Sequence, residues 1–190
     1  MSRRPVCAAI LFGLVFFGME AIILVGIQAS GKSHFYKERF FNSHVRISLD
    51  LLKTRHREGR MVQLCLETRQ PFVIDNTNAK AEDRVRFIQP AKARGYRIIG
   101  YFFEPDIREA LKRNETRTGP TRVPKPAIFA TYKRLQRPLL QEGFDQLFLV
   151  WSGPNQAFVV EPWREEQESV LQVGNPPGQL EIRGASERLG

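Results

Sequence analysis

The chain has 190 residues, enough for one domain with a sizeable core and a tail, and its 42% hydrophobic and 26% charged residues are ordinary for a globular protein. Two cysteines, Cys7 and Cys65, exclude a disulfide framework and favour a reducing compartment, so we expect a cytoplasmic protein; the three histidines form no ligand-like pair for zinc. The net charge is +9, and because residues 161–190 carry −3, the remainder carries +12. This basic body indicates either a polyanionic partner or general solubility charge.

The first eighteen residues are an apolar N-terminal extension. Two arginines precede the uncharged segment 5–18, which is too short to span a bilayer and would have to borrow the strand that follows. An anchor, a signal peptide or an upstream extension of the true start would each account for it. We favour the extension, with Met19 as the natural beginning of the domain, and expect no stable membrane partner.

A phosphate-binding loop follows the first strand. The apolar run 21–25 predicts a short buried strand, and the next eight residues fit G-x-x-x-x-G-K-[ST] without a gap: Gly26, Ile27, Gln28, Ala29, Ser30, Gly31, Lys32 and Ser33. Such a loop turns its backbone N–H groups inward around a phosphate chain, and the helix behind it adds partial positive charge. We therefore expect nucleoside triphosphate binding, with Lys32 on the outer phosphates and Ser33 on Mg²⁺.

Two acidic residues come after the next two strands. Residues 44–48 predict a strand that leads to Asp50, and after a helix at 57–68 the buried strand 72–74 leads to Asp75. Carboxylates just beyond parallel strands lie at the ligand-binding edge of an open α/β sheet. We expect Asp75 to join the metal site, although Asp is also a common helix N-cap, and Asn78 to cap the next helix. We expect Asp50 to be the base that accepts a hydroxyl proton, unless it caps the short helix after it.

The rest of the chain continues the alternation of helices and strands. The expected elements are a helix at 79–95, a strand at 96–103, helices at 106–114 and 126–135, a strand at 147–151 and an antiparallel edge strand at 157–160. From residue 162 the sequence becomes acidic and then Gly/Pro-rich, as in a disordered tail. The expected domains are therefore 1–18, 19–161 and 162–190.

This pattern predicts an α/β fold with three layers around a mostly parallel five-stranded sheet. Right-handed crossovers gather the carboxyl ends of the strands, and with them the loop 26–33, Asp50 and Asp75, on one edge. The polar loop 115–124 is typical of a lid, and Arg113 and Arg117, four residues apart, can both point toward one nucleotide. A solvated charged face is the alternative for these arginines. Lys53, beyond Asp50, is placed to hold a phosphate of the acceptor, and a solvated helix face explains this lysine equally well.

These motifs together resemble a known family. The loop 26–33, the segment 50–53, Asp75-Asn76-Thr77-Asn78 and Arg113 with Arg117 are similar to the kinase domain of 5′-polynucleotide kinases over about residues 21–135. The resemblance implies a P-loop kinase that phosphorylates a 5′-hydroxyl from ATP, with Asp50 acting on the hydroxyl and Lys53 on an acceptor phosphate. Small-molecule kinases and zeta-toxin-like sugar-nucleotide kinases carry related elements.

We therefore expect an ATP- and Mg²⁺-dependent phosphotransferase whose acceptor is a hydroxyl, with a polynucleotide 5′-end as the leading choice. A small metabolite or a nucleotide sugar is the alternative acceptor. A nucleotide-dependent ATPase or switch protein is the alternative of another class, although such a protein has no need of a base at Asp50 beside a basic acceptor pocket.

Overall fold

A computed structural model of the chain describes residues 18–153 and 157–164. The apolar extension expected at 1–18 and the tail expected from residue 162 therefore lie almost entirely outside the described residues.

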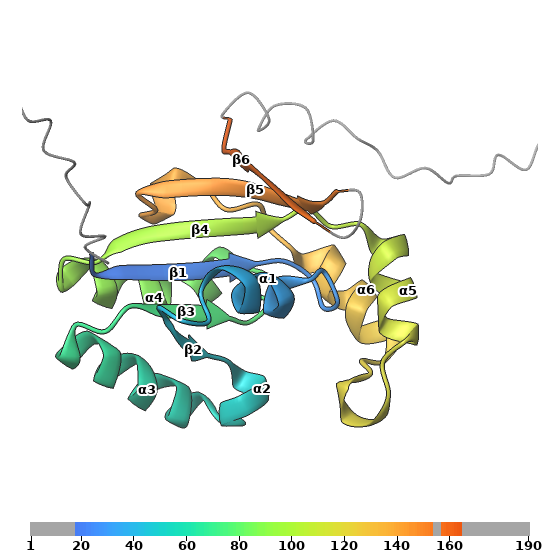
Figure 1. Cartoon of the computed structure of the whole chain (residues 1–190), viewed down its shortest axis with the longest axis horizontal. Coiled ribbons are helices and arrows are strands. Elements are labelled where there is room, and N and C mark those ends of the chain that lie inside the picture. The colour runs from blue at the N-terminus through green and yellow to red at the C-terminus, as the bar shows by residue number, and fades with distance from the viewer. Residues whose placement is uncertain (1–17, 154–156, 165–190) are drawn as a thin grey trace, which may run out of the picture.

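One six-stranded sheet forms the centre of the fold, in the order β2-β3-β1-β4-β5-β6 (Figure 1). The first five strands are parallel and β6 pairs with β5 in the antiparallel sense. The strands are β1 (Glu20–Val25), β2 (Val45–Ile47), β3 (Phe72–Asp75), β4 (Arg97–Phe103), β5 (Gln146–Ser152) and β6 (Phe158–Pro162). The α/β class is confirmed, and the sheet has six strands rather than five because the expected edge strand completes it.

Helices cover both faces of this sheet. The helices are α1 (Lys32–Arg39), α2 (Leu49–Leu52), α3 (Arg55–Thr68), α4 (Ala81–Ala93), α5 (Ile107–Glu115) and α6 (Lys125–Arg134), with 3₁₀ turns η1 (Gly119–Thr121) and η2 (Leu140–Glu142). In Figure 1, α1 lies in front of the sheet and α4 behind it. Successive β1 residues alternate between the two sides: Ile22 and Leu24 pack with α1, whereas Ile23 and Val25 pack with α3 and α4. This alternation is what a strand buried on both faces requires.

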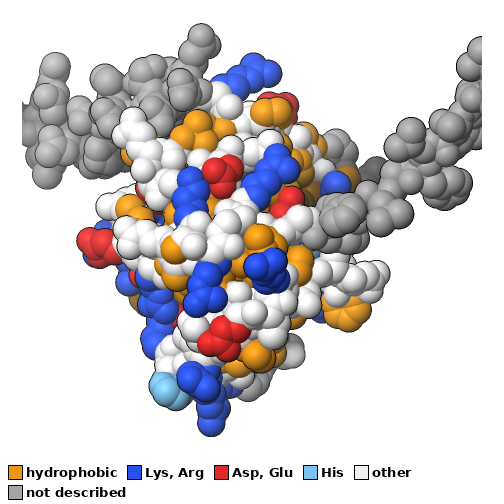
Figure 2. Space-filling model, turned by 90° about the vertical axis from the view of Figure 1, so that its left-hand side faces the viewer, with side chains coloured by type: hydrophobic (Ala, Val, Ile, Leu, Met, Phe, Trp, Pro, Cys, Tyr) orange, Lys and Arg blue, Asp and Glu red, His pale blue; other side chains and the backbone are white. Residues whose placement is uncertain are grey.

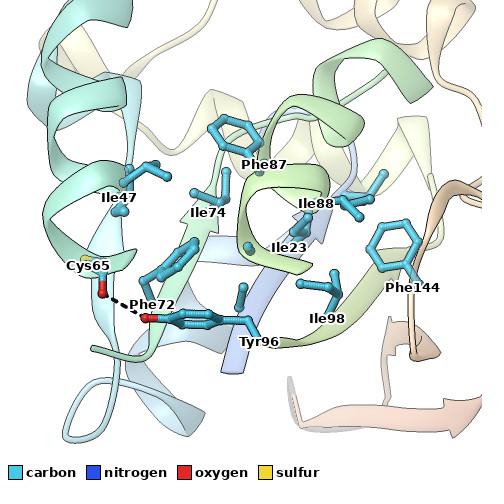
Figure 3. Close-up of a cluster of buried hydrophobic side chains, with 14 of the residues drawn as sticks. Ile23, Ile47, Cys65, Phe72, Ile74, Phe87, Ile88, Tyr96, Ile98 and Phe144 are labelled. Atoms are coloured by element: carbon cyan, nitrogen blue, oxygen red, sulfur yellow. Dashed lines mark hydrogen bonds between the residues drawn. The ribbon is translucent and has the colours of Figure 1, made fainter. Parts of the chain in front are cut away.

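The larger core lies on the α3–α4 side (Figure 3). There Ile23, Ile74 and Ile98 from three neighbouring strands meet Phe87 and Ile88 of α4, and all five are at most 3% exposed. This apolar layer holds the strands in register and leaves the loops at their carboxyl ends to carry the polar chemistry.

The segment between β3 and α4 differs from one expectation. Asn78 was a candidate N-cap for the following helix, but Lys80 occupies that position. Asn78 instead adopts a left-handed conformation (φ 46°) and donates a 2.7 Å hydrogen bond to the carbonyl of Leu24 at the end of β1. The fully buried Arg84 then donates to the Asn78 carbonyl and pairs with Glu142. The β3 loop is thus fastened from both sides.

The described chain continues slightly beyond the expected domain limit at residue 161. Pro162 is the last residue of β6, and the Trp163 ring packs edge-on against Phe102 at 5.9 Å. Trp163 therefore contributes to the packed domain.

No helix among the described residues is long and apolar enough to cross a membrane. Figure 2 faces the end of the molecule where the parallel strands begin, and there Lys and Arg side chains are interspersed with acidic and apolar ones. The positive charge is not gathered into a single patch on that face. The opposite end, where the strands terminate, carries the candidate site.

Candidate active site

A cavity of about 820 Å³ opens at the carboxyl ends of the parallel strands. Its walls come from the loop 26–33, the junction after β2, the end of β3 and the segment between α5 and α6. Five basic and three acidic side chains line it: Lys32, Lys53, Arg55, Arg113, Arg117, Asp50, Asp75 and Asp83. All the site residues that the sequence predicted with a charged side chain therefore meet around one space.

The loop between β1 and α1 has the close-packed backbone that its glycines allow. A Cβ atom on Gly26 would come within 2.9 Å of the Phe103 Cβ, and Gly31, with φ +99°, would place one 3.1 Å from the Phe158 ring. The Gly26 N–H donates to the Thr77 carbonyl at 3.0 Å, which ties the loop to the end of β3. Larger residues at these two positions would move the loop backbone away from a phosphate chain.

Lys32 is buried beneath this loop. Its Nζ donates to the carbonyls of Gly26 at 2.8 Å and Ile27 at 2.5 Å. Burial lowers the pKa of Lys32 from 10.5 to about 8, with the Asp75 and Asp50 carboxylates opposing the shift and the Arg117 charge adding to it. Burial therefore disfavours the charged form of the Lys32 side chain, and further negative charge nearby would stabilise it.

Ser33 and Asp75 lie together, as a shared metal site requires. The Ser33 hydroxyl donates to Asp75 Oδ2 at 2.8 Å. Among the described residues no cluster of three or more His, Cys, Asp or Glu side chains could hold a metal by itself. A hydroxyl and one carboxylate nevertheless fit Mg²⁺, which keeps several waters and is usually held by one or two carboxylates plus substrate phosphates.

Arg46, in the middle of β2, contacts both of these side chains. Its Nε donates to Asp75 Oδ2 at 2.7 Å, and its NH2 group donates to the Ser33 hydroxyl at 3.1 Å. The sequence analysis did not single out Arg46. An arginine between Val45 and Ile47 in the middle of a predicted strand was the available signal, because a charge that becomes buried there needs a partner.

Asp50 lies in the first turn of α2, and Ser48 takes the N-cap position. Asp50 is therefore not the cap of this helix, which removes the structural alternative considered for it. Its carboxylate is exposed and lines the cavity, as does Lys53, which ends α2 in a left-handed conformation (φ 67°). Both side chains therefore line the same cavity as the phosphate-binding loop.

The segment between α5 and α6 closes the far wall. Arg113 on α5 is held by Glu109 at 3.0 Å and by the Ser152 hydroxyl at 2.9 Å, while Arg117 lies in the loop itself. Asn114, only 1% exposed, donates to the Val123 carbonyl at 2.7 Å and accepts from the Val123 N–H at 2.9 Å. This two-way bond clasps the ends of the 115–122 loop, a role that the sequence did not reveal.

A second cavity, of about 1100 Å³, adjoins the first. The two share Ala29, Ser30, Arg113 and Ser152. The second extends from the phosphate-binding loop across the ends of β4 and β5, beside Trp151. Together the two spaces are more than large enough for a nucleotide and an acceptor, since ligand pockets typically measure 300–1,000 Å³.

A comparison with protein families decides the affiliation of this chain. The family described as AAA domain matches residues 22–139, which is more than half of the chain and runs from β1 to just beyond α6. The chain belongs to this AAA domain family. The match contains the phosphate-binding loop, Asp50, Asp75, Arg113 and Arg117.

This AAA domain protein has a curated relative that acts as a polynucleotide phosphatase and kinase. The bifunctional polynucleotide phosphatase/kinase of Schizosaccharomyces pombe is 28% identical over 129 residues, which are 66% of this chain and 32% of that protein. The chain thus aligns with about one third of the length of that relative. The expected resemblance to P-loop kinases and to the polynucleotide kinase domain is confirmed at this level.

Solved structures show the same fold. Kti12 of Chaetomium thermophilum, determined with ADP-AlF3, has a TM-score of 0.54 at 15% identity and covers 72% of this chain and 92% of its own. A gluconokinase of Sinorhizobium meliloti 1021 has a TM-score of 0.51 at 19% identity, covering 69% and 81%. At these identities the likeness establishes the P-loop kinase fold and leaves the acceptor open.

Proposed function

We propose that this protein is an ATP- and Mg²⁺-dependent kinase that transfers the γ-phosphate of ATP to the 5′-hydroxyl of a polynucleotide. The observation that carries the proposal is the shared cavity, in which Asp50 of α2 and Lys53 just after that helix face the same space as Lys32 and Ser33 of the phosphate-binding loop. A pure ATPase has no need of a basic acceptor wall next to a carboxylate. The homology to the fission yeast phosphatase/kinase favours a polynucleotide end as acceptor.

In this mechanism the loop 26–33 binds the phosphates through its N–H groups, and Lys32 exchanges its loop carbonyls for phosphate oxygens. The adjoining cavity beside Trp151 takes the nucleoside. Mg²⁺, held by Ser33 and Asp75 with the phosphates, would supply charge neutralisation between phosphate oxygens. Arg113 and Arg117 stabilise the charge that builds up on the transferred group.

The transfer step places the acceptor against α2. Asp50 accepts the proton of the hydroxyl as its oxygen bonds to the γ-phosphorus, while the bond to the bridging oxygen breaks and ADP leaves with that electron pair. Lys53 binds the first internucleotide phosphate of the acceptor as a point charge. We place this reaction in the cytoplasm, a reducing compartment that suits the free thiol of Cys65.

The test is transfer of label from γ-labelled ATP. The acceptors are 5′-hydroxyl DNA and RNA oligonucleotides, the same oligonucleotides already 5′-phosphorylated, nucleosides, gluconate and nucleotide sugars. We expect label only on the 5′-hydroxyl oligonucleotides, and none where a phosphate blocks the end. Efficient transfer to a small molecule with none to any oligonucleotide would contradict the proposed acceptor. Phosphate release without any transfer would contradict the kinase activity and indicate an ATPase.

A further inference from the structure

Arg46 has a position that the proposed kinase mechanism does not use. Its guanidinium lies against both side chains that the proposal assigns to the metal: NH2 is 2.5 Å from Asp75 Oδ2 and 3.1 Å from the Ser33 hydroxyl. The Asp75 side chain is 2% exposed and that of Arg46 is 22% exposed. This is therefore a largely buried ion pair beside the cavity wall that Ser33 and Asp75 form, unlike the exposed pairs on the surface.

The surroundings hold Arg46 in this place. Arg46 pairs with Val73 in the parallel β2–β3 ladder. This pairing fixes the backbone of Arg46 next to the strand residue that lies two positions before Asp75, the last residue of β3. The guanidinium also lies 5.7 Å from the centre of the Tyr36 ring on α1, which favours a cation. An arginine held by a strand, a ring and a carboxylate is preorganised in a way that a surface arginine is not.

The Asp75 carboxylate cannot fully balance the charges of both the Arg46 guanidinium and a divalent metal ion. A buried Asp75 without a positive partner would be strongly unfavourable, and Arg46 supplies that partner. A divalent ion at Ser33 and Asp75 would then meet a carboxylate whose charge is already balanced, with a guanidinium beside it. Such a site is short of negative charge unless the phosphates of a nucleotide provide it.

We propose, on the basis of the kinase function above, that Arg46 is a positioning residue that makes metal binding at Ser33 and Asp75 conditional on the triphosphate. It orients the Asp75 carboxylate toward Ser33 and suppresses binding of free Mg²⁺, so that the metal is taken up together with ATP. Removing the positive charge should convert the pair into a site that binds Mg²⁺ alone.

The test measures Mg²⁺-linked stability without nucleotide or acceptor. A ligand that binds only the folded state raises its stability, so the thermal midpoint followed against MgCl₂ at constant ionic strength reports binding. We compare the full chain with Arg46→Met and with Arg46→Lys, which keeps the charge. Arg97→Met is the matched control, because Arg97 is also a strand arginine paired with a carboxylate, Glu20, but both lie at the first residue of their strands, at the end of the sheet away from Ser33 and Asp75.

We expect Arg46→Met to unfold at a lower temperature and to regain stability with Mg²⁺, at a half-saturating concentration at least tenfold below that of the unmodified chain. Arg46→Lys and Arg97→Met should respond as the unmodified chain does, and adding Asp75→Asn should remove the response of Arg46→Met. Should Arg46→Met not fold, Arg46→Gln gives the same comparison. Equal Mg²⁺ responses in all variants, or a response that survives Asp75→Asn, would overturn the inference.

A second measurement separates this inference from the proposed function. Affinity for a fluorescent ATP analogue is measured with Mg²⁺ and with EDTA, and the ratio should shrink at least tenfold in Arg46→Met. Absence of label transfer in the acceptor assay would refute the kinase proposal while leaving this ratio informative. An unchanged ratio together with normal transfer would refute the role of Arg46 alone.

Discussion

Asn76 Nδ2 donates a 2.7 Å hydrogen bond to Oε1 of Glu58, a carboxylate whose side chain has no exposed surface. The Oδ1 atom of the same amide accepts from the backbone N–H of Leu49 at 2.9 Å. Glu58 is in turn paired with Arg55 at 2.8 Å and with Arg86 of α4. Asn76 thus connects the end of β3 to α3 and to the first turn of α2, which carries the proposed base.

Replacing Asn76 by alanine should lower kcat by about tenfold to a hundredfold while leaving nucleotide affinity within about twofold, because it frees the turn that carries Asp50 and does not touch the phosphate-binding loop. The orphaned Glu58 oxygen should also cost about 1–3 kcal/mol of stability. Transfer kinetics, nucleotide titration and urea unfolding measure the three quantities.

Gln63→Ala is the matched control, because Gln63 makes the same amide–carboxylate bond with Glu67 on the exposed face of α3. It should change none of the three quantities appreciably. Parallel losses of kcat and nucleotide affinity in Asn76→Ala would contradict a role confined to α2.

Asp50→Asn should reduce transfer to the acceptor by about 10²–10⁴-fold, the range for loss of a general base, and should not weaken ATP binding. Asp83→Asn is the control, because Asp83 lines the same cavity but accepts a hydrogen bond from the backbone N–H of Lys80 at the start of α4. Single-turnover transfer and nucleotide titration distinguish the two variants. Full turnover in Asp50→Asn would reject the assignment.

Nucleotide affinity should depend on the titration of Lys32. Burial lowers the pKa of Lys32 to about 8, and phosphates bind the charged form, so affinity should be flat below pH 8 and fall by up to tenfold per pH unit above it. Lys32→Arg, charged throughout, should give weaker binding with a flat profile between pH 6.5 and 9.5. A sloping profile in Lys32→Arg would place the titrating group elsewhere.

The lowered pKa of Lys32 also affects the stability of the fold. The unfolded lysine titrates near 10.5 and the folded one near 8, so between these values the unfolded chain binds the additional proton. The contribution of Lys32 should therefore make the free energy of unfolding rise with pH across this window. Lys32→Met should remove that contribution, which denaturant unfolding at pH 8 and pH 9.5 can measure.

Asn114→Ala should release the lid. Losing both bonds to Val123 leaves two backbone groups without their partner and should cost about 1–3 kcal/mol. Because a loose lid admits water, ATP hydrolysis should rise relative to transfer, and limited proteolysis should cut within 115–122 sooner. Thr116→Ala, which removes only an exposed hydroxyl bonded to the Arg113 carbonyl, is the control. An unchanged ratio of ATP hydrolysis to transfer in Asn114→Ala would show that the Asn114–Val123 hydrogen bonds do not control water access.

Local sequence patterns determined the architecture and the donor half of the site. Strand and helix periodicities are local properties, and G-x-x-x-x-G-K-[ST] is one contiguous turn, so the parallel sheet and the loop 26–33 were predictable without knowledge of long-range contacts. Chain topology then required Asp50 and Asp75 to lie on the same edge, and both do line one cavity.

The tertiary structure alone decided which side chains support those residues. Arg46 and Asp75 are 29 residues apart, and Asn76 and Glu58 are 18 apart, so nothing in either local segment indicates the partner. Asn78 was expected to cap a helix and Asn114 only to end one, yet each bonds a backbone group brought near by packing. Such contacts form only when strands and helices from separate parts of the chain meet, because a hydrogen bond depends on distance in space and not on spacing in sequence.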